Sequence, residues 1–197
     1  MNPVPRKGWK GQLDRFIGPG ATPAEIVLQL IPSAGAAIAA PLYASMLPIE
    51  WNSWQLGLIA ILGFDLVGGV LTNATAAAKR WYHRPGQGWR QHIAFICVHL
   101  CHIGLVALLL RGADGFFFVG VSSYLLLAAG LILSSPLYLQ RPVALGLYGV
   151  ALLGDRYLFA PTLGLEWFLP LFFLKLLVSH LLNEAVYQPG DCRKSAS

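Results

Sequence analysis

The chain has 197 residues, of which 56% are hydrophobic and only 12% are charged, and its formal net charge is +5. Its mean hydropathy of +0.59 lies above the range of ordinary soluble domains, so the composition indicates an integral membrane protein. The basic residues stand in short clusters beside apolar segments, which is the pattern of membrane topology signals. We therefore expect a lipid bilayer, and no nucleic acid, as the principal partner.

The first 22 residues are polar and basic, and we expect them to form a cytoplasmic amphipathic segment (1–22). Its apolar residues Trp9, Leu13, Phe16 and Ile17 recur at helical spacing among charged side chains. This pattern predicts a short helix that lies in the membrane interface as an anchor. A lid over a cytoplasmic opening is the alternative.

Six apolar segments follow, each near or above the roughly 20 residues that cross a bilayer as a helix. They predict membrane-spanning helices at 23–47, 54–79, 91–111, 116–139, 142–160 and 164–187. The fifth has the shortest apolar core, so a tilted or re-entrant segment is the alternative there. The expected fold class is all-α: a polytopic membrane helix bundle with a single transmembrane domain at 23–187 and a cytoplasmic tail at 188–197.

Lys and Arg residues are distributed unequally between the two sides of this bundle. Eleven of the fourteen fall in the termini and loops of one side, whereas the other side carries only Arg111 and Arg156. The positive-inside rule then places both termini in the cytoplasm, and an even number of spans agrees with that. The expected location is the cytoplasmic (inner) membrane, as a multi-pass protein.

Several ionisable residues lie deep in these apolar segments: Asp65, His99, His102, Lys175 and His180. A charged side chain at bilayer depth costs about 2.5 kcal/mol or more, so such residues usually face a protein interior and belong to a functional site. At a rise of 1.5 Å per residue they fall between the midplane and the cytoplasmic side. The same half of the bundle contains further polar residues, namely Thr72, Asn73, Ser179, Asn183 and Glu184.

We expect these residues to line a polar pocket in the inner leaflet that serves a small or lipid-like ligand. The first hypothesis is a metal-assisted membrane enzyme, because imidazole and carboxylate groups are the donors that zinc or iron accepts. In this hypothesis His99, His102 and His180 bind a divalent metal, and Thr72, Asn73, Ser179 and Asn183 bind the ligand. Asp65 and Glu184 act as metal ligands or as acid–base groups, and Lys175 tunes the charge or binds an anion.

Two other hypotheses stay open. One is a proton-coupled transporter or ion-conducting protein, in which Asp65, His102, Lys175 and His180 form a relay; an Asp65–Lys175 ion pair without transport is the simpler alternative. The other is a b-type haem protein or accessory subunit, with His180 and either His99 or His102 as axial ligands. No established motif of a membrane enzyme family is present in the sequence. A homo-oligomer is compatible with each hypothesis.

Two further features of the sequence have a structural interpretation. Cys97 and Cys101 lie within an apolar segment, and we expect them to be small core residues rather than part of a disulfide framework. The loop that contains His83 is rich in basic and aromatic residues, and this composition indicates anchoring at the membrane interface. Headgroup binding, or acid–base chemistry at His83, is the alternative.

Overall fold

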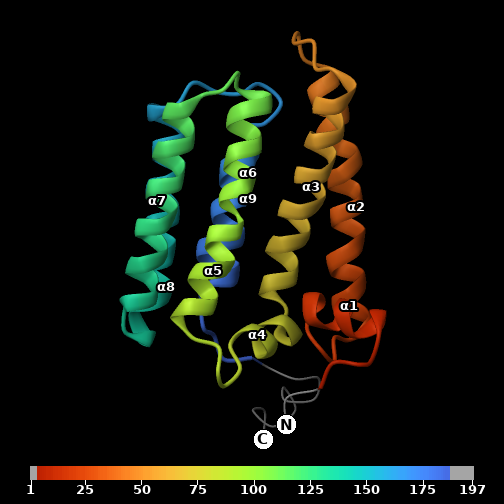
Figure 1. The fold of residues 1–197 in the computed structure, drawn as a ribbon, viewed down its shortest axis with the longest axis vertical. Helices are drawn as coiled ribbons and strands as arrows, with labels where there is room; N and C mark the ends of the chain where they lie inside the picture. The colour runs from red at the N-terminus through yellow and green to blue at the C-terminus, as the bar shows by residue number, and fades with distance from the viewer. Residues whose placement is uncertain (1–3, 187–197) are drawn as a thin grey trace, which may run out of the picture.

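A computed structural model describes residues 4–186 and shows an all-helical bundle without strands in that part of the chain. Consecutive helices combine into six rods that run alternately up and down (Figure 1). They are α2 (Pro23–Ser45), α3 (Ser53–Ala74), α5–α6–η1 (Trp89–Val98, Leu100–Leu105, Val106–Leu110), α7 (Gly115–Ser134), α8 (Leu137–Leu158) and α9–η2 (Phe168–Phe173, Leu174–His180). Two short helices, α1 (Trp9–Ile17) and α4 (Ala76–Tyr82), lie at one end.

Four of the rods are long and apolar enough to cross a membrane: Pro23–Ser45, Ser53–Ala74, Trp89–Leu110 and Gly115–Ser134. Helix α8 has 22 residues but carries Arg141 near its start and the pair Asp155–Arg156 near its end. The α9–η2 rod has only 13 residues, about 20 Å at the usual helical rise, which is shorter than the hydrocarbon core of a bilayer. The six apolar segments are thus present as helical rods, and four of the rods meet the criteria of length and apolar composition for a membrane span.

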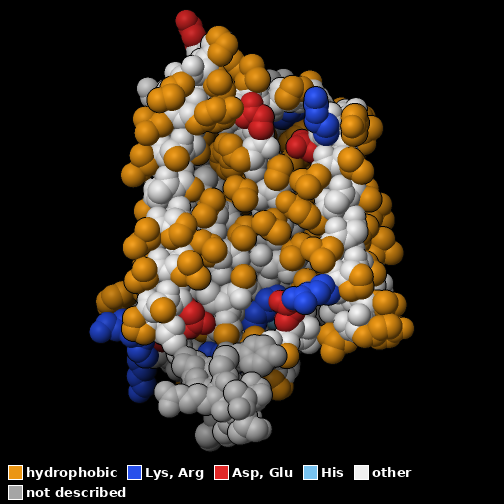
Figure 2. All heavy atoms as spheres, turned by 180° about the vertical axis from the view of Figure 1, so that it is seen from behind, with side chains coloured by type: hydrophobic (Ala, Val, Ile, Leu, Met, Phe, Trp, Pro, Cys, Tyr) orange, Lys and Arg blue, Asp and Glu red, His pale blue; other side chains and the backbone are white. Residues whose placement is uncertain are grey.

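The outer surface has the character expected beside lipid. Hydrophobic side chains cover the middle of the face seen in Figure 2, and Lys, Arg, Asp and Glu are confined to its two ends. Large apolar residues are exposed on several helices, among them Ile38, Leu108, Val119, Leu127 and Leu153. An apolar belt between charged ends matches a bilayer-embedded bundle.

The short α9–η2 rod lies at the centre of the bundle, where it packs against α3, α7 and α8, whereas α2 packs on α3 at the edge. Its side chains are almost all buried, including Phe168, Phe172, Leu176 and Leu177. The chain before and after this rod is irregular, but irregular backbone at membrane depth is tolerated where other helices surround it. This central position brings η2 side chains against both α3 and α5–α6.

The end of the bundle that carries α1, α4 and the loop 83–88, here called the α4 end, differs from the expected boundaries. The predicted helix 54–79 is interrupted at Thr75, whose extended backbone (φ −68°, ψ 149°) ends α3. The Thr75 hydroxyl accepts a hydrogen bond from the Ala78 amide and so caps α4, which turns across the end of the bundle. The predicted helix 164–187 is shorter than expected, because it begins at Phe168 and ends at His180.

The boundary between the fourth and fifth segments also differs from the predicted one. The predicted segments 116–139 and 142–160 place this boundary at residues 140 and 141, but α7 ends at Ser134 and α8 already begins at Leu137. Ser135 is extended (ψ 142°), as the residue before a proline prefers to be, so Pro136 separates the two helices. Pro142 instead lies inside α8.

Candidate functional site

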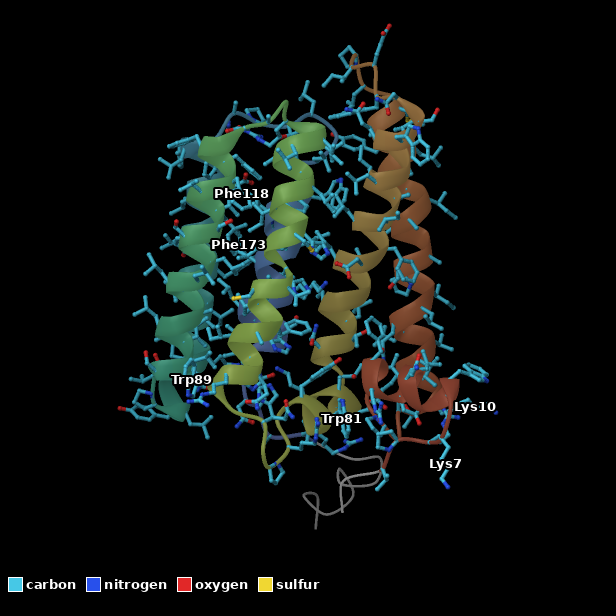
Figure 3. All side chains as sticks on the ribbon, viewed as in Figure 1. Lys7, Lys10, Trp81, Trp89, Phe118 and Phe173 are labelled. Atoms are coloured by element: carbon cyan, nitrogen blue, oxygen red, sulfur yellow. The ribbon has the colours of Figure 1, made fainter. Side chains whose placement is uncertain are left out.

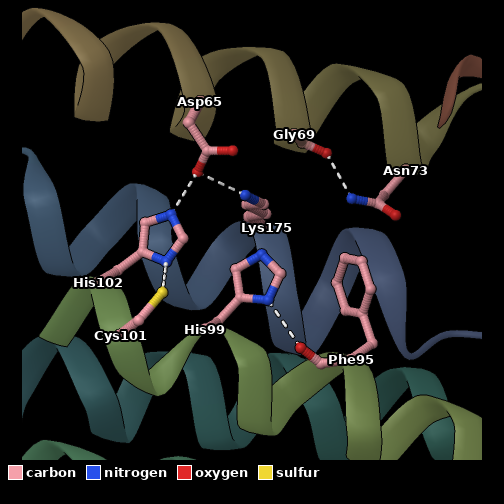
Figure 4. A network of polar contacts seen from close by, with 8 residues as sticks. All are labelled: Asp65, Gly69, Asn73, Phe95, His99, Cys101, His102 and Lys175. Atoms are coloured by element: carbon pink, nitrogen blue, oxygen red, sulfur yellow. Dashed lines mark hydrogen bonds and ion pairs between the residues drawn. The ribbon is translucent and has the colours of Figure 1, made fainter. Parts of the chain in front are cut away.

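The Asp65 carboxylate lies near the middle of α3 and is bound from two other helices (Figure 4). Its Oδ2 atom accepts hydrogen bonds from Lys175 Nζ on η2 at 2.6 Å and from His102 Nε2 on α6 at 3.0 Å. The Lys175 side chain is only 4% exposed, whereas the Asp65 side chain is 32% exposed. The ion pair that the sequence allowed is thus present, and one of its members is accessible from outside the protein.

A glycine makes room for the lysine beside α3. A Cβ atom at Gly69 would lie 2.6 Å from Lys175 Cδ and 2.9 Å from Nζ, closer than non-bonded atoms approach. The lysine side chain therefore lies directly on the α3 backbone, one turn from Asp65. The segment that presents Lys175 is a π-helix, a form that is frequent at functional sites.

The second nitrogen of His102 faces a thiol. Cys101 Sγ lies 3.4 Å from His102 Nδ1, so Cys101, His102 and Asp65 form a continuous chain of polar contacts. Cys101 and Cys97 are both exposed on the surface of this helix, and the prediction that they are core residues was wrong. The α5–α6 rod turns its histidines inward and its cysteines toward the bilayer side.

His99 lies beside His102 and extends the site toward the α4 end. The two rings are stacked at 5.0 Å between centroids, and His99 Nδ1 donates to the Phe95 carbonyl at 2.7 Å. The Phe95 ring stacks on His180 at 3.8 Å and lies 4.5 Å from His99. Phe95 thus separates the inner histidines from the next group.

His180 is the centre of that next group, which lies near the α4 end. Its Nδ1 lies 3.0 Å from Asn73 Oδ1 and its Nε2 lies 3.2 Å from His92 Nδ1. The His83 ring stacks on His92 at 4.7 Å, and His83 Nε2 lies 3.0 Å from the His180 carbonyl oxygen and donates to it. All five histidines of the sequence therefore line one column from the α4 end to Asp65.

The column begins at a buried, basic end. Lys79 Nζ donates to the Leu182 carbonyl at 2.5 Å, and burial lowers the Lys79 pKa to about 8. Burial, followed by repulsion from His92 and Lys79, lowers the His83 pKa to about 4, so His83 is neutral at pH 7. At the α4 end, two basic groups thus have pKa values below their ordinary ones, mainly because of burial.

On the far side of Asp65 the interior is apolar. Fully buried side chains from α3, α6 and α9 fill the space toward the opposite end, namely Ile59, Leu62, Ile103, Phe168 and Phe172. Arg111 at that end is bound to Asp114 and to the Ala160 carbonyl, which ties together the loops that follow η1 and α8. In the described residues the polar column therefore runs from the α4 end to Asp65 and ends there.

The other predicted site residues lie in different surroundings. Thr72 donates to Gln29 on α2, and Ser179 is buried. Asn183 and Glu184 lie beyond the end of η2, where Asn183 is exposed and Glu184 pairs with Arg141 at 2.7 Å. Glu184 was expected within the last membrane segment beside His180, but the helix ends at His180.

The expected metal ligands do not form one set. His180 is separated from His99 and His102 by the Phe95 ring, and both of its nitrogens already face polar partners. Residues 4–186 contain no group of three or more His, Cys, Asp or Glu side chains arranged to hold a metal ion. The same Phe95 ring fills the space that a haem between His180 and His99 or His102 needs, so the side chains fit neither group.

The sequence analysis missed the contact between Cys101 and His102, and it did not include His83 and His92 among the pocket residues. The signal for the cysteine was its position next to His102, at the depth of Asp65 on another helix. Comparison of the chain with known protein families, with characterised proteins and with solved structures finds no match. The function must therefore be inferred from the geometry of the site.

Proposed function

We propose that the protein is a multi-pass enzyme of the cytoplasmic membrane that carries out acid–base chemistry at Asp65 and His102 on a lipid-like substrate. One observation supports this most strongly: Asp65 is bound by both His102 and Lys175 at bilayer depth, yet 32% of its side chain is exposed. A buried ion pair with a purely structural role has no need of such access. Placing an ionisable group at this depth costs free energy, and such groups are therefore candidates for a functional role.

All six rods cross the membrane in this proposal, with both termini in the cytoplasm. The α4 end carries most of the basic residues in the described chain, and Figure 3 shows Lys7, Lys10, Trp81 and Trp89 there. The opposite end has only Arg111 and Arg156, each beside an aspartate. This asymmetry supports a cytoplasmic α4 end.

The chemistry assigned to each side chain follows from its contacts. With its proton on Nε2, His102 donates to Asp65, which leaves Nδ1 free to accept a proton from a reacting group. Asp65 holds the imidazole in that tautomer and stabilises the imidazolium that forms. Lys175 is a positioning residue, because its ammonium keeps Asp65 ionised without reaching the exposed side.

The geometry favours acid–base chemistry over the metal-assisted chemistry expected from the sequence. The three histidines that were candidate ligands belong to two groups, on either side of Phe95. Their contacts to one another and to Asn73 and Asp65 are those of a hydrogen-bonded column. No step of the proposal therefore depends on a metal or a haem.

The histidine column supports a second candidate, a proton-coupled transporter. A line of five imidazoles from the α4 end to Asp65 suits proton movement between the cytoplasm and the middle of the bundle. The apolar side chains beyond Asp65 favour the enzyme, since a transporter needs a second path to the other side. In the enzyme, the histidine column transfers protons between His102 and the cytoplasm.

A comparison of lipid composition tests the proposal. The purified protein is reconstituted in vesicles of phosphatidylethanolamine and phosphatidylglycerol that contain a pH-sensitive dye, and the lipids are analysed by mass spectrometry. We expect a lipid product that disappears with Asp65→Asn and with His102→Ala. Unchanged lipids with a dye response to an imposed pH gradient support the transporter, and neither signal contradicts both candidates.

A further inference from the structure

The chain of contacts at the exposed side of the site contains a nucleophile. Cys101 Sγ faces His102 Nδ1 at 3.4 Å, and His102 Nε2 faces Asp65 Oδ2 at 3.0 Å. We infer that Cys101 is the nucleophile of a thiol–imidazole–carboxylate triad that accepts acyl groups from esters in the bilayer. This inference rests on the proposed function and names its substrate class, a fatty acyl ester.

The order of the three side chains is the one that nucleophilic catalysis requires. A weak nucleophile lies within reach of a base, and a third group orients that base from its far side. The sulfur–nitrogen distance of 3.4 Å suits a thiol hydrogen bond, and such contacts are often loose before substrate binds. Triads of this kind occur on unrelated folds and are recognised by geometry rather than by sequence order.

The three residues lie on two helices that are brought together by the fold. Cys101 and His102 are neighbours on α6, but Asp65 comes from α3, and few backbone contacts join these two helices. Side chains bridge them instead, at Asp65–His102 and, nearer the opposite end, where Gln55 Nε2 donates to the Leu109 carbonyl at 2.9 Å.

An apolar groove of about 430 Å³ lies against α3 and Leu109 of η1, around the Gln55 bridge. Its lining is mostly hydrocarbon and includes Trp54, Leu58, Ile61 and Leu109. Residues 58, 61 and 65 lie on one face of α3, so the groove shares its face with Asp65. Its lining beside α3 runs from Asn52 to Ile61, about 14 Å along the helix and one turn short of Asp65, and this length suits an extended hydrocarbon chain.

We assign this groove to the acyl chain of the substrate. The acyl chain is apolar and the groove lies on helices that are apolar enough to span the bilayer. Its Ile61 end is one turn of α3 from Asp65, which His102 links to the Cys101 thiol. An ester with its hydrocarbon tail in the groove then presents its carbonyl carbon toward Cys101 Sγ. A water-soluble acyl donor has no comparable path from the surrounding lipid.

The reaction balances with these groups and one named co-reactant. The Cys101 thiol loses its proton to His102 Nδ1 and attacks the ester carbonyl, forming the S–C bond and a tetrahedral oxyanion. The carbonyl re-forms as the C–O bond to the leaving alcohol breaks, and His102 gives that alcohol the proton. Water then attacks the thioester with His102 as base, which releases the fatty acid and restores the thiol.

The test uses an acyl transfer that needs no knowledge of the natural ester. The protein, with Cys192→Ser so that Cys97 and Cys101 are its two thiols, is incubated with p-nitrophenyl palmitate in phosphatidylcholine vesicles. Intact mass and peptide mapping report the acylated residue, and hydroxylamine identifies a thioester. We expect one palmitoyl group on Cys101. We also expect an initial burst of p-nitrophenol that is equimolar with the protein.

Cys97 provides the matched control, because it lies one turn away on the same surface and is equally exposed. Cys97→Ser should acylate at the unchanged rate and Cys101→Ser should not acylate. His102→Ala should slow the reaction of Cys101 about 100-fold or more, the usual contribution of a general base. Equal labelling of Cys97 and Cys101, or labelling unaffected by His102→Ala, overturns the inference.

The vesicle lipid assay separates this inference from the proposed function. If lipid turnover survives Cys101→Ser but not His102→Ala, the acid–base enzyme stands and the covalent triad is wrong. If turnover survives both substitutions, the proposed function is wrong as well. Cys101→Ala serves as a second variant, since an exposed side chain leaves no cavity when it is shortened.

Discussion

The Lys175 ammonium and the Asp65 carboxylate lie 2.6 Å apart between two helices at bilayer depth, but they are unequally buried. The lysine side chain is enclosed, whereas the aspartate retains one-third of its exposure and a second partner in His102. This inequality turns a structural ion pair into a site with one accessible carboxylate. It also sets the order in which substitutions should cost stability.

Asp65→Asn should be more destabilising than Lys175→Met. The first leaves an enclosed ammonium without its counter-charge, which costs about 3–5 kcal/mol for a buried pair. The second leaves a partly exposed carboxylate that keeps its hydrogen bond to His102, so we expect about 1.5–3 kcal/mol, the range of a hydrogen bond to a charged group. SDS titration of the detergent-solubilised protein measures both, and the reverse order would contradict the assigned burial.

Gly69→Ala should disturb the same pair without touching either charge. The new Cβ meets Lys175 Cδ and Nζ, and the ammonium cannot move away freely because Asp65 holds it. We expect a loss of stability of about 1–3 kcal/mol, as for overpacking a core, together with reduced lipid turnover. Gly130→Ala on α7 is the control, since a Cβ there meets nothing within 4 Å.

Stability should fall with pH below about 6.5 through His83. Its pKa is about 4 in the fold, lowered by burial and by His92 and Lys79, and 6.5 when unperturbed. Between these values the unfolded chain binds more protons, so the stabilisation is complete above pH 6.5 and is lost as pH falls toward 4. Melting curves from pH 4 to 8 measure this slope. His83→Gln should flatten it, and an unchanged slope would place the acid-sensitive group elsewhere.

Tyr82→Phe should loosen α1 from the α4 end. The Tyr82 hydroxyl donates to the carbonyls of Arg15 and Phe16, at 3.3 and 3.0 Å, and thereby ties the end of α1 to α4. Loss of this bond costs about 1 kcal/mol, roughly a fivefold rise in the open population. Trypsin cleavage after Arg15 should accelerate accordingly. Tyr138→Phe, at an exposed position on α8, should leave the cleavage rate unchanged.

Glu184→Gln should change little, although the sequence suggested a catalytic role for this residue. Its partner Arg141 is 72% exposed and Glu184 itself is 37% exposed, so the pair is worth about 0–1 kcal/mol. Lipid turnover should equal that of the unsubstituted protein, because the proposed chemistry takes place at Asp65. A loss of turnover with normal stability would return Glu184 to the site.

Some of the site was accessible from the residues alone. Depth along each apolar segment placed Asp65, His102 and Lys175 at one level, and the structure joins all three. Depth could not show that Phe95 divides the histidines, because a ring on the same helix as His99 gives no sign in sequence of where it packs. It also could not show that the last helix ends at His180, which removes Glu184 from the site.

The sequence by itself determined the all-helical class, the apolar segments and the presence of costly ionisable groups inside them. These depend on composition and local order, which one segment carries without its neighbours. Only the tertiary structure decided that Asp65 meets His102 and Lys175, that Cys101 faces outward beside them and that five histidines share one column. Those contacts depend on which helices are adjacent and on how each is rotated, and packing among all of them fixes both.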